Sequence, residues 1–271
     1  MKIINNFDSL GELIDRCNQQ GVWKRNTMHT EQISDYWTKF SGVKSFDDAL
    51  GLAVFGWTDG LNKIVSAMAQ LPAKPARLQS REMAIAGAFP DVAAYCAGEP
   101  AYMVNLGNQE NAQAPIIRLL VNSVCGWKVG AESIINRGAA IASIIDALEQ
   151  AGQRVELVAC SKSQRDGKSI TNKVTIKRAE DPLELDKIVF CLAHPSFGRR
   201  LLLRLTEQRK ELDKSAWDQY GGAIDFEASD LEQGEIYFPF IKESGHDTPN
   251  QSRQTIKCQL ENQGVRIDFN A

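Results

Sequence analysis

The sequence contains only three histidines in 271 residues, and the patterns that common catalytic sites need are missing. No Gly-x-Ser-x-Gly turn is present to expose a serine nucleophile beside a histidine base. Neither Gly-x-Gly-x-x-Gly nor Gly-x-x-x-x-Gly-Lys-Ser/Thr occurs, so the familiar phosphate-binding loops are excluded. We therefore predict no catalytic residue and favour a non-enzymatic protein.

His194 is the histidine whose position comes nearest to suggesting a site. It follows the apolar run Ile188–Ala193 and precedes Pro195, so we expect it at the C-terminal end of a strand, where open α/β sheets bind ligands. Because nothing in the sequence supplies a nucleophile and an orienting partner, the interpretation that it merely caps or packs is favoured over a hydrolase role. His29 and His246 carry less weight.

Paired cysteines, long apolar runs and an excess of one charge are also lacking. The six cysteines are spread singly with no Cys-x-x-Cys pair, which indicates reduced core residues of a cytosolic protein. No window approaches the ~20 apolar residues of a membrane span. The start lacks the cationic and apolar regions of a secretory signal. We expect a cytoplasmic protein, in the host cytoplasm if phage-encoded, with no membrane partner.

Residues 1–110 are predicted to form a helical N-terminal region. Asp8 or Ser9 can cap a first helix, and Ser45 can cap a clearer one whose first turn is acidic. Helical spacing resumes from Leu61 after the Gly56–Gly60 break and stops at Pro72. The turn formers between 76 and 114 then indicate a boundary.

Residues 111–271 are predicted to form an α/β domain with a doubly wound, mostly parallel sheet. The apolar run 116–121, the amphipathic stretch 131–151 and the run 154–160 have the pattern of a strand, a helix and a strand, which favours a parallel crossover. Further expected strands are 173–178, 188–193, 235–241 and 265–269, with helices at 196–212 and 250–263.

Two of these stretches, 116–160 and 235–269, resemble the opening and closing pieces of a von Willebrand factor A domain. The closest likeness is Ala147–Leu157, where Gly-Gln-Arg-Val-Glu-Leu matches the family's Gly-x-Arg-Val-x-Leu. The resemblance implies a doubly wound fold that binds other macromolecules through its strand-end loops.

That family holds Mg²⁺ in an Asp-x-Ser-x-Ser loop after the first strand. Here Asn122 takes the aspartate position, and Val124 and Gly126 take the serine positions. A second acidic ligand would have to come from Glu243 or Asp247. We therefore expect no metal and no cofactor.

A second resemblance is to uncharacterised phage and bacterial proteins. It rests on Ser-Phe-x-x-Ala-Leu…Gly-Trp-x-x-Gly at Ser45–Gly60 and on Arg-Gly-Ala-Ala at Arg137–Ala140. It implies a phage origin and no mechanism.

Basic residues gather in two groups that could follow a phosphate backbone. The first group is Lys162, Arg165, Lys168, Lys173, Lys177 and Arg178. The second, on an expected helix, is Arg199, Arg200, Arg204, Arg209 and Lys210. Trp217 and Tyr220 would add stacking platforms. The competing interpretation is a solvated face balanced by nearby acidic residues.

Two further candidate binding residues stand alone. Trp57, within Gly56–Gly60, suits a binding loop, although a tryptophan packed between two helices is the favoured interpretation. Lys128 follows the first strand of the α/β region, where a turn is favoured over a phosphate contact.

The sequence thus predicts a non-enzymatic adaptor that binds another protein, with an ATPase or a polymerase as the partner expected in a phage. The alternative is a single-stranded DNA-binding accessory factor for phage replication or transcription.

Overall fold

The computed structural model describes residues 1–19, 30–69, 81–85, 89–90, 92–106, 116–150, 153–181, 184–212, 222–242 and 245–263. One mixed sheet organises most of them. Its strands are β1 (Lys2–Phe7), β5 (Ile116–Asn122), β6 (Arg154–Arg165), β7 (Lys168–Lys177), β8 (Gly222–Ala223) and β9 (Ile236–Phe238). They run in the order β1-β7-β6-β5-β9, with β8 paired to β6.

Most strand pairs in this sheet are parallel, as predicted. β1 pairs with β7, and β5 pairs with both β6 and β9, in parallel. β6 and β7 form an antiparallel hairpin around Asp166 and Gly167, which both adopt positive φ. The crossover from β5 to β6 passes through one long helix at 131–150. Its isoleucines recur at helical spacing, so a helix places them on one face that can be buried. The protein is therefore a mixed α/β fold.

Helices form the second part of the main body. They are α1 (Leu10–Cys17), α2 (Asp35–Ser41), α3 (Phe46–Phe55), α4 (Thr58–Ala69), α6 (Ala131–Gln150), α7 (Leu185–Ala193), the π-helix η2 (Phe197–Leu202), α8 (Leu203–Glu207), the short 3₁₀ helices η3 (Lys210–Leu212) and η4 (Ala228–Asp230), and α9 (Pro249–Glu261). The Ser9 and Ser45 hydroxyls cap α1 and α3, as the sequence predicts. None of the described helices combines the length and apolar character that crossing a membrane requires.

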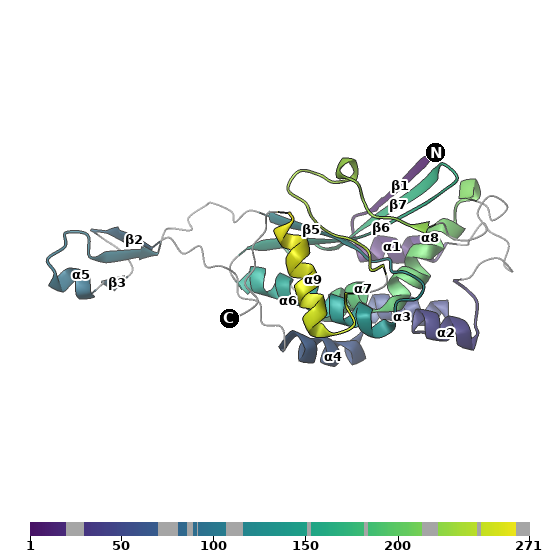
Figure 1. The fold of residues 1–271 in the computed structure, drawn as a ribbon, viewed down its shortest axis with the longest axis horizontal. Coiled ribbons are helices and arrows are strands. Elements are labelled where there is room, and N and C mark those ends of the chain that lie inside the picture. The colour runs from purple at the N-terminus through teal and green to yellow at the C-terminus, as the bar shows by residue number, and fades with distance from the viewer. Residues whose placement is uncertain are drawn as a thin grey trace.

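The α-helices that pack on the sheet in the described residues all lie on one face, whereas the three-residue 3₁₀ helix η4 lies on the opposite face, where Asp230 pairs with Lys162. Leu119 and Val121 of β5 pack there against α6, α7 and α9, and the helices lie below the sheet in Figure 1. Leu120 points the other way, where Phe226 and Tyr237 cover it without a helix. The doubly wound arrangement, which needs helices on both faces, is therefore not found in the described part of the chain.

The prediction that residues 1–110 are helical is wrong at two places. Lys2–Phe7 is strand β1, and it joins the main sheet beside β7. Asn5 and Phe7 of this strand are buried, and the residues next to Asn5 on either side are exposed. The hydrophobic alternation that identifies a strand in sequence is missing, because one of the two buried positions is an asparagine. Phe7 shares a core cluster with Val174 and Phe190, so this N-terminal strand packs on the same core as residues 159–205.

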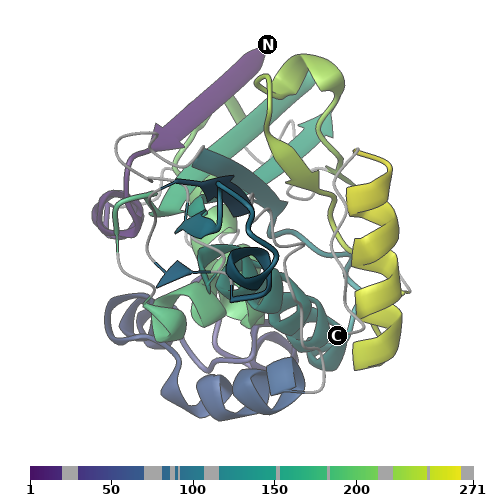
Figure 2. The same cartoon turned by 90° about the vertical axis from the view of Figure 1, so that its left-hand side faces the viewer.

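The second exception is a small antiparallel sheet between α4 and β5. It contains β2 (Arg81–Ala84), β4 (Met103–Leu106) and β3 (Phe89–Pro90) in that order, with the short helix α5 (Val92–Cys96). Figures 1 and 2 show this unit standing apart from the main body, toward the viewer in Figure 2. The Tyr95 ring meets Tyr102 edge-on with centroids 5.1 Å apart.

The expected strand at 188–193 is also wrong, because these residues belong to helix α7. Its residues Ile188–Ala193 are all buried, since α7 packs against the sheet, α6, α3 and α4 at once. A helix that is apolar all round has no stripe, so its six-residue apolar run looks like a buried strand. The expected helix at 196–212 is η2, α8 and η3 in succession, and the expected strand at 265–269 lies outside the described residues.

Candidate functional site

The loop 123–130, which we call the strand-end loop, follows β5 at the C-terminal edge of the parallel strands. The Ser123 amide donates to the Cys160 carbonyl at 2.8 Å, and the Gly126 amide donates to the Ile241 carbonyl at 2.8 Å. A side chain at Gly126 would collide with the Lys242 carbonyl, 2.3 Å from the position of its Cβ. Only glycine therefore lets the loop approach the segment after β9 so closely.

Asn122 closes the base of this loop with its amide. The side chain is fully buried. Its Nδ2 donates to the Tyr237 hydroxyl at 3.1 Å and the Ile224 carbonyl at 3.3 Å, while Oδ1 accepts from the Val124 amide at 3.2 Å. Both ends of the amide are thus used in holding the loop.

Arg137 of α6 lies beneath the loop and ties the ends of two strands together. Its guanidinium donates to the carbonyls of Asn122 at 3.1 Å, Phe238 at 3.3 Å and Pro239 at 2.8 Å. Burial lowers the pKa of Arg137 to about 10, which leaves it charged at neutral pH. A positive charge is therefore built in where β5 and β9 end.

Arg199 of η2 holds the same loop from the other side. It donates to the Gly126 carbonyl at 3.2 Å and the Val129 carbonyl at 3.0 Å, and also to the Phe40 carbonyl at 2.6 Å. Its guanidinium lies 4.1 Å from the centroid of the Phe40 ring. Arg199 thus holds the backbone of the strand-end loop itself, while Arg137 holds the end of β5 from which the loop begins.

Trp127 projects from this fixed loop with 72% of its surface exposed. The Lys128 ammonium lies 5.2 Å from the centroid of its ring, within cation–π range. Lys242, whose side chain is 72% exposed, stands on the neighbouring segment. The edge therefore presents one large aromatic surface beside two accessible lysines.

His194 lies in the core and does not reach this edge. It is the C-cap of α7, and its Nδ1 accepts from the Ser196 amide at 3.1 Å and lies 2.7 Å from the Ser196 hydroxyl. The Trp57 ring meets it edge-on at 4.6 Å. Burial lowers its pKa to about 4, and Ser196 is fully buried. This geometry supports the packing interpretation for both His194 and Trp57.

Of the two acidic residues considered for a metal, the structure describes only Asp247. Asp247 accepts a hydrogen bond from the Ser133 hydroxyl at 3.0 Å, and Glu243 lies outside the described residues. Within the described ranges no three His, Cys, Asp or Glu side chains form a group able to hold a metal.

A family model matches residues 1–267 of the chain, which includes the N-terminal helices and the sheet alike. The chain belongs to the DUF7192 family, a domain of unknown function. Comparison with curated proteins and with solved structures gave no match.

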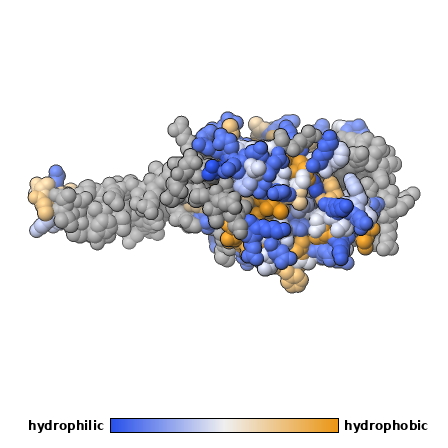
Figure 3. Space-filling model, turned by 60° about the horizontal axis from the view of Figure 1, so that its bottom comes forward, coloured by the Kyte–Doolittle hydropathy of each residue, from blue (hydrophilic) through white to orange (hydrophobic). Residues whose placement is uncertain are grey.

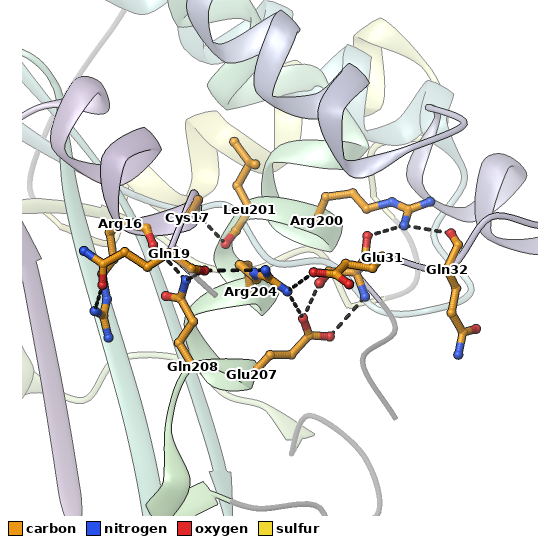
Figure 4. A network of polar contacts seen from close by, with 11 residues as sticks. Arg16, Cys17, Gln19, Glu31, Gln32, Arg200, Leu201, Arg204, Glu207 and Gln208 are labelled. Atoms are coloured by element: carbon orange, nitrogen blue, oxygen red, sulfur yellow. Dashed lines mark hydrogen bonds and ion pairs between the residues drawn. The ribbon is translucent and has the colours of Figure 1, made fainter. Parts of the chain in front are cut away.

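Three members of the second basic group of this DUF7192 chain, Arg199, Arg200 and Arg204, are buried, so the interpretation of a basic helix face exposed at these positions is wrong. Arg209 is half-buried and Lys210 is exposed. Figure 4 shows Arg200 and Arg204 within a polar network. Arg200 donates to the carbonyls of Thr30 and Gln32, and Arg204 pairs with Glu31 at 2.8 Å and Glu207 at 3.3 Å. Spacing correctly placed both arginines on one helix face, but that face docks the segment before α2 instead of meeting solvent.

The first basic group does not form one surface either. Lys162 is buried and pairs with Asp230 at 2.5 Å, while Lys177 is buried beside Glu149 at 2.7 Å. Lys173 and Lys168 donate to carbonyls, at 3.3 Å to Asp230 and 3.0 Å to Glu211. The Arg165 side chain, Trp217 and Tyr220 lie outside what the structure describes. Both basic groups are thus largely occupied by intramolecular contacts.

The helical side of the molecule offers no broad alternative surface in the view of Figure 3. Hydrophobic residues stand there in small groups among hydrophilic ones. The site that sequence reasoning missed is the pair Arg137 and Trp127. A signal was available, because helical spacing places Arg137 on the apolar face that contains Ile134, Ile141 and Ile144.

Proposed function

We propose that this protein is an adaptor that binds a partner protein through the strand-end loop, with Trp127 as the anchor and no bridging metal. The observation that carries the proposal is a 72% exposed tryptophan on a loop whose backbone Arg199 holds and whose base Arg137 ties to the end of β9. Tryptophan is enriched among the few residues that dominate binding energy at protein interfaces. A loop already held in place also loses little further freedom on binding.

We further propose that residues 116–261 form a degenerate von Willebrand factor A-like module. The chain order β5, α6, β6 and then β9, α9 supports it, as does the parallel pairing of β9 with β5. In that family a cation sits beyond the first strand, and here the Arg137 guanidinium already contacts carbonyls at that edge. We therefore expect partner binding without added Mg²⁺.

The single-stranded DNA alternative rests on fewer residues than the sequence suggested, because Arg199, Arg200 and Arg204 are buried. Among the described residues of this edge, the accessible cations are Lys128, which lies over the Trp127 ring, and Lys242, which pairs with Asp225 at 3.6 Å. Binding of DNA there would depend steeply on salt. Salt-dependent DNA binding through Trp127 would therefore separate this alternative from the adaptor function.

The test compares Trp127→Ala with Phe55→Ala, a matched aromatic that is 79% exposed on α3. Tagged wild-type and variant proteins are used to recover bound proteins from the source cells in EDTA, followed by affinity measurement on the recovered partner. We expect Trp127→Ala to weaken binding about 30-fold, as for a hot-spot tryptophan, and Phe55→Ala to leave it unchanged. Equal affinity of the two variants would contradict the proposal. So would salt-dependent retardation of single-stranded DNA that requires Trp127.

A further inference from the structure

A pocket lies on the sheet face opposite the α-helices, and none of its lining residues belongs to the strand-end loop. Its volume is about 390 Å³. Its floor is formed by side chains of β1 and β7, and Ser229, Asp230 and Glu232 form one wall. Pockets of this size suit small molecules.

Thr171 of β7 is the most informative residue in this floor. Alternate residues of a strand point to opposite faces, and Ile170 and Val174 are buried on the helical face. Thr171 therefore points to the other face, into the pocket that it lines. The residue is only 3% exposed, yet its hydroxyl has no hydrogen-bond partner among the described residues.

A buried hydroxyl without a partner destabilises the folded protein, because it has lost its hydrogen bonds to water and no protein group replaces them. Such a group in the floor of an open pocket is explained if a ligand supplies the missing hydrogen bond.

The charges around Thr171 favour a ligand with acceptor oxygens. The register places Thr171 beside Ile4 of β1 and Lys162 of β6. Lys2 and Lys162 both pair with Asp230, at 3.1 and 2.5 Å, and Lys173 donates to the Asp230 carbonyl at 3.3 Å. Lys173 also forms an ion pair with Glu235 at 3.8 Å.

The Asp230 carboxylate at this end of the pocket already accepts three hydrogen bonds, from Lys2, Lys162 and the Glu227 amide. Burial alone would raise the pKa of Asp230, but hydrogen bonds from Lys162, the Glu227 amide and Lys2 outweigh it and lower the pKa to about 2. Each lysine ammonium has three donors, so Lys2 and Lys173 keep donors to spare. Lys2 and Lys173 can therefore each donate a further hydrogen bond to a ligand beside Thr171.

We propose that this pocket binds a small ligand through a carboxylate or phosphate group, which accepts hydrogen bonds from Thr171, Lys2 and Lys173. The other end of the pocket is acidic, since Arg118 there faces Glu156 at 2.8 Å, Glu232 at 2.7 Å and Glu235 at 3.4 Å. The donors of Thr171, Lys2 and Lys173 thus favour the side of the pocket away from Arg118 for the anion.

The experiment uses the full chain and three probes, inorganic phosphate, succinate and glucose, at constant ionic strength. Saturable chemical-shift changes at the Thr171 and Lys173 amides are expected with phosphate or with succinate, and which of the two binds tighter identifies the group. Glucose is expected to cause none. Failure of both anions to produce saturable shifts, or binding of glucose alone, overturns the proposal.

Thr171→Val separates a ligand-binding hydroxyl from a purely structural one by comparing melting temperature with anion affinity. It removes an unpartnered hydroxyl and keeps the shape, so the melting temperature should stay unchanged or rise while anion binding weakens about tenfold. The matched control is Thr255→Val in α9, whose hydroxyl donates to the Gly245 carbonyl at 2.8 Å. It should lower the melting temperature and leave binding intact.

Lys2→Gln supplies an independent readout, because Lys2 is half-exposed and its loss should not unfold the protein. It should weaken anion binding about tenfold as well. Unchanged anion affinity in both Thr171→Val and Lys2→Gln would overturn the assignment.

Discussion

The Arg137 guanidinium donates to the Pro239 carbonyl at 2.8 Å, and this bond joins the helix after β5 to the end of β9. Together with the bonds from Arg137 to Asn122 and Phe238, it fixes the edge from which Trp127 projects. A cation supplied by the chain thus joins the ends of β5 and β9 at the point where the strand-end loop begins.

Replacing Arg137 by methionine should destabilise the protein strongly. The change leaves carbonyls at the ends of β5 and β9 without their donors, and we expect a loss of roughly 3 kcal/mol in the free energy of unfolding. Urea denaturation measures it. Arg178→Met is the control, because Arg178 is exposed and makes one 3.3 Å bond to the Asp8 carbonyl. Similar small losses in both variants would argue against the role given to Arg137.

Restoring the acidic residue of the von Willebrand factor A motif with Asn122→Asp should not create a metal site. A carboxylate cannot donate to the Ile224 carbonyl as the Asn122 amide does at 3.3 Å. We expect a loss of about 2 kcal/mol in stability. Thermal unfolding with and without Mg²⁺ checks this, and a rise in melting temperature specific to Mg²⁺ in the variant would show that the loop retains ligands we have not recognised.

Acid should weaken the fold through two buried histidines. Burial lowers the pKa of His194 and of His246 to about 4 from 6.5. Between pH 6.5 and about pH 4 these histidines are therefore protonated in the unfolded chain and neutral in the folded protein. The stabilisation is present above pH 6.5 and is lost as the pH falls toward 4, by on the order of 3 kcal/mol per histidine.

Urea unfolding between these pH values measures the slope. His194→Asn keeps an acceptor near the Ser196 amide but cannot titrate, so it should remove one proton from the pH dependence. A variant with the wild-type slope would show that His194 titrates normally in the folded protein.

The sheet and long helices could be predicted because their signals are local. Apolar runs gave β5 and β6, and isoleucines at helical spacing gave α6. α7 could not be told from a strand, since burial on every side removes its periodicity. β1 depends on pairing with β7, about 167 residues along the chain, and no local pattern records that contact.

The candidate site was harder to predict because charge does not reveal where a side chain points. Arg200 and Arg204 look like surface cations in sequence, yet their donors meet buried carbonyls and carboxylates. Trp127 looks like an ordinary turn residue in sequence, yet its side chain is far more exposed than those of Arg200 and Arg204. Whether a side chain is buried, like these arginines, or exposed, like Trp127, is decided by how η2 and α6 pack in the folded protein.

The most direct test of the adaptor function is site-specific photo-cross-linking from the strand-end loop in the source cells. A photoreactive amino acid is placed at Lys128, beside the Trp127 ring, and at Phe55 as the control. Our account predicts one discrete cross-linked protein from position 128, its loss on Trp127→Ala, and none of it from position 55. Equal cross-linking from both positions, or a product at 128 that survives Trp127→Ala, would contradict it.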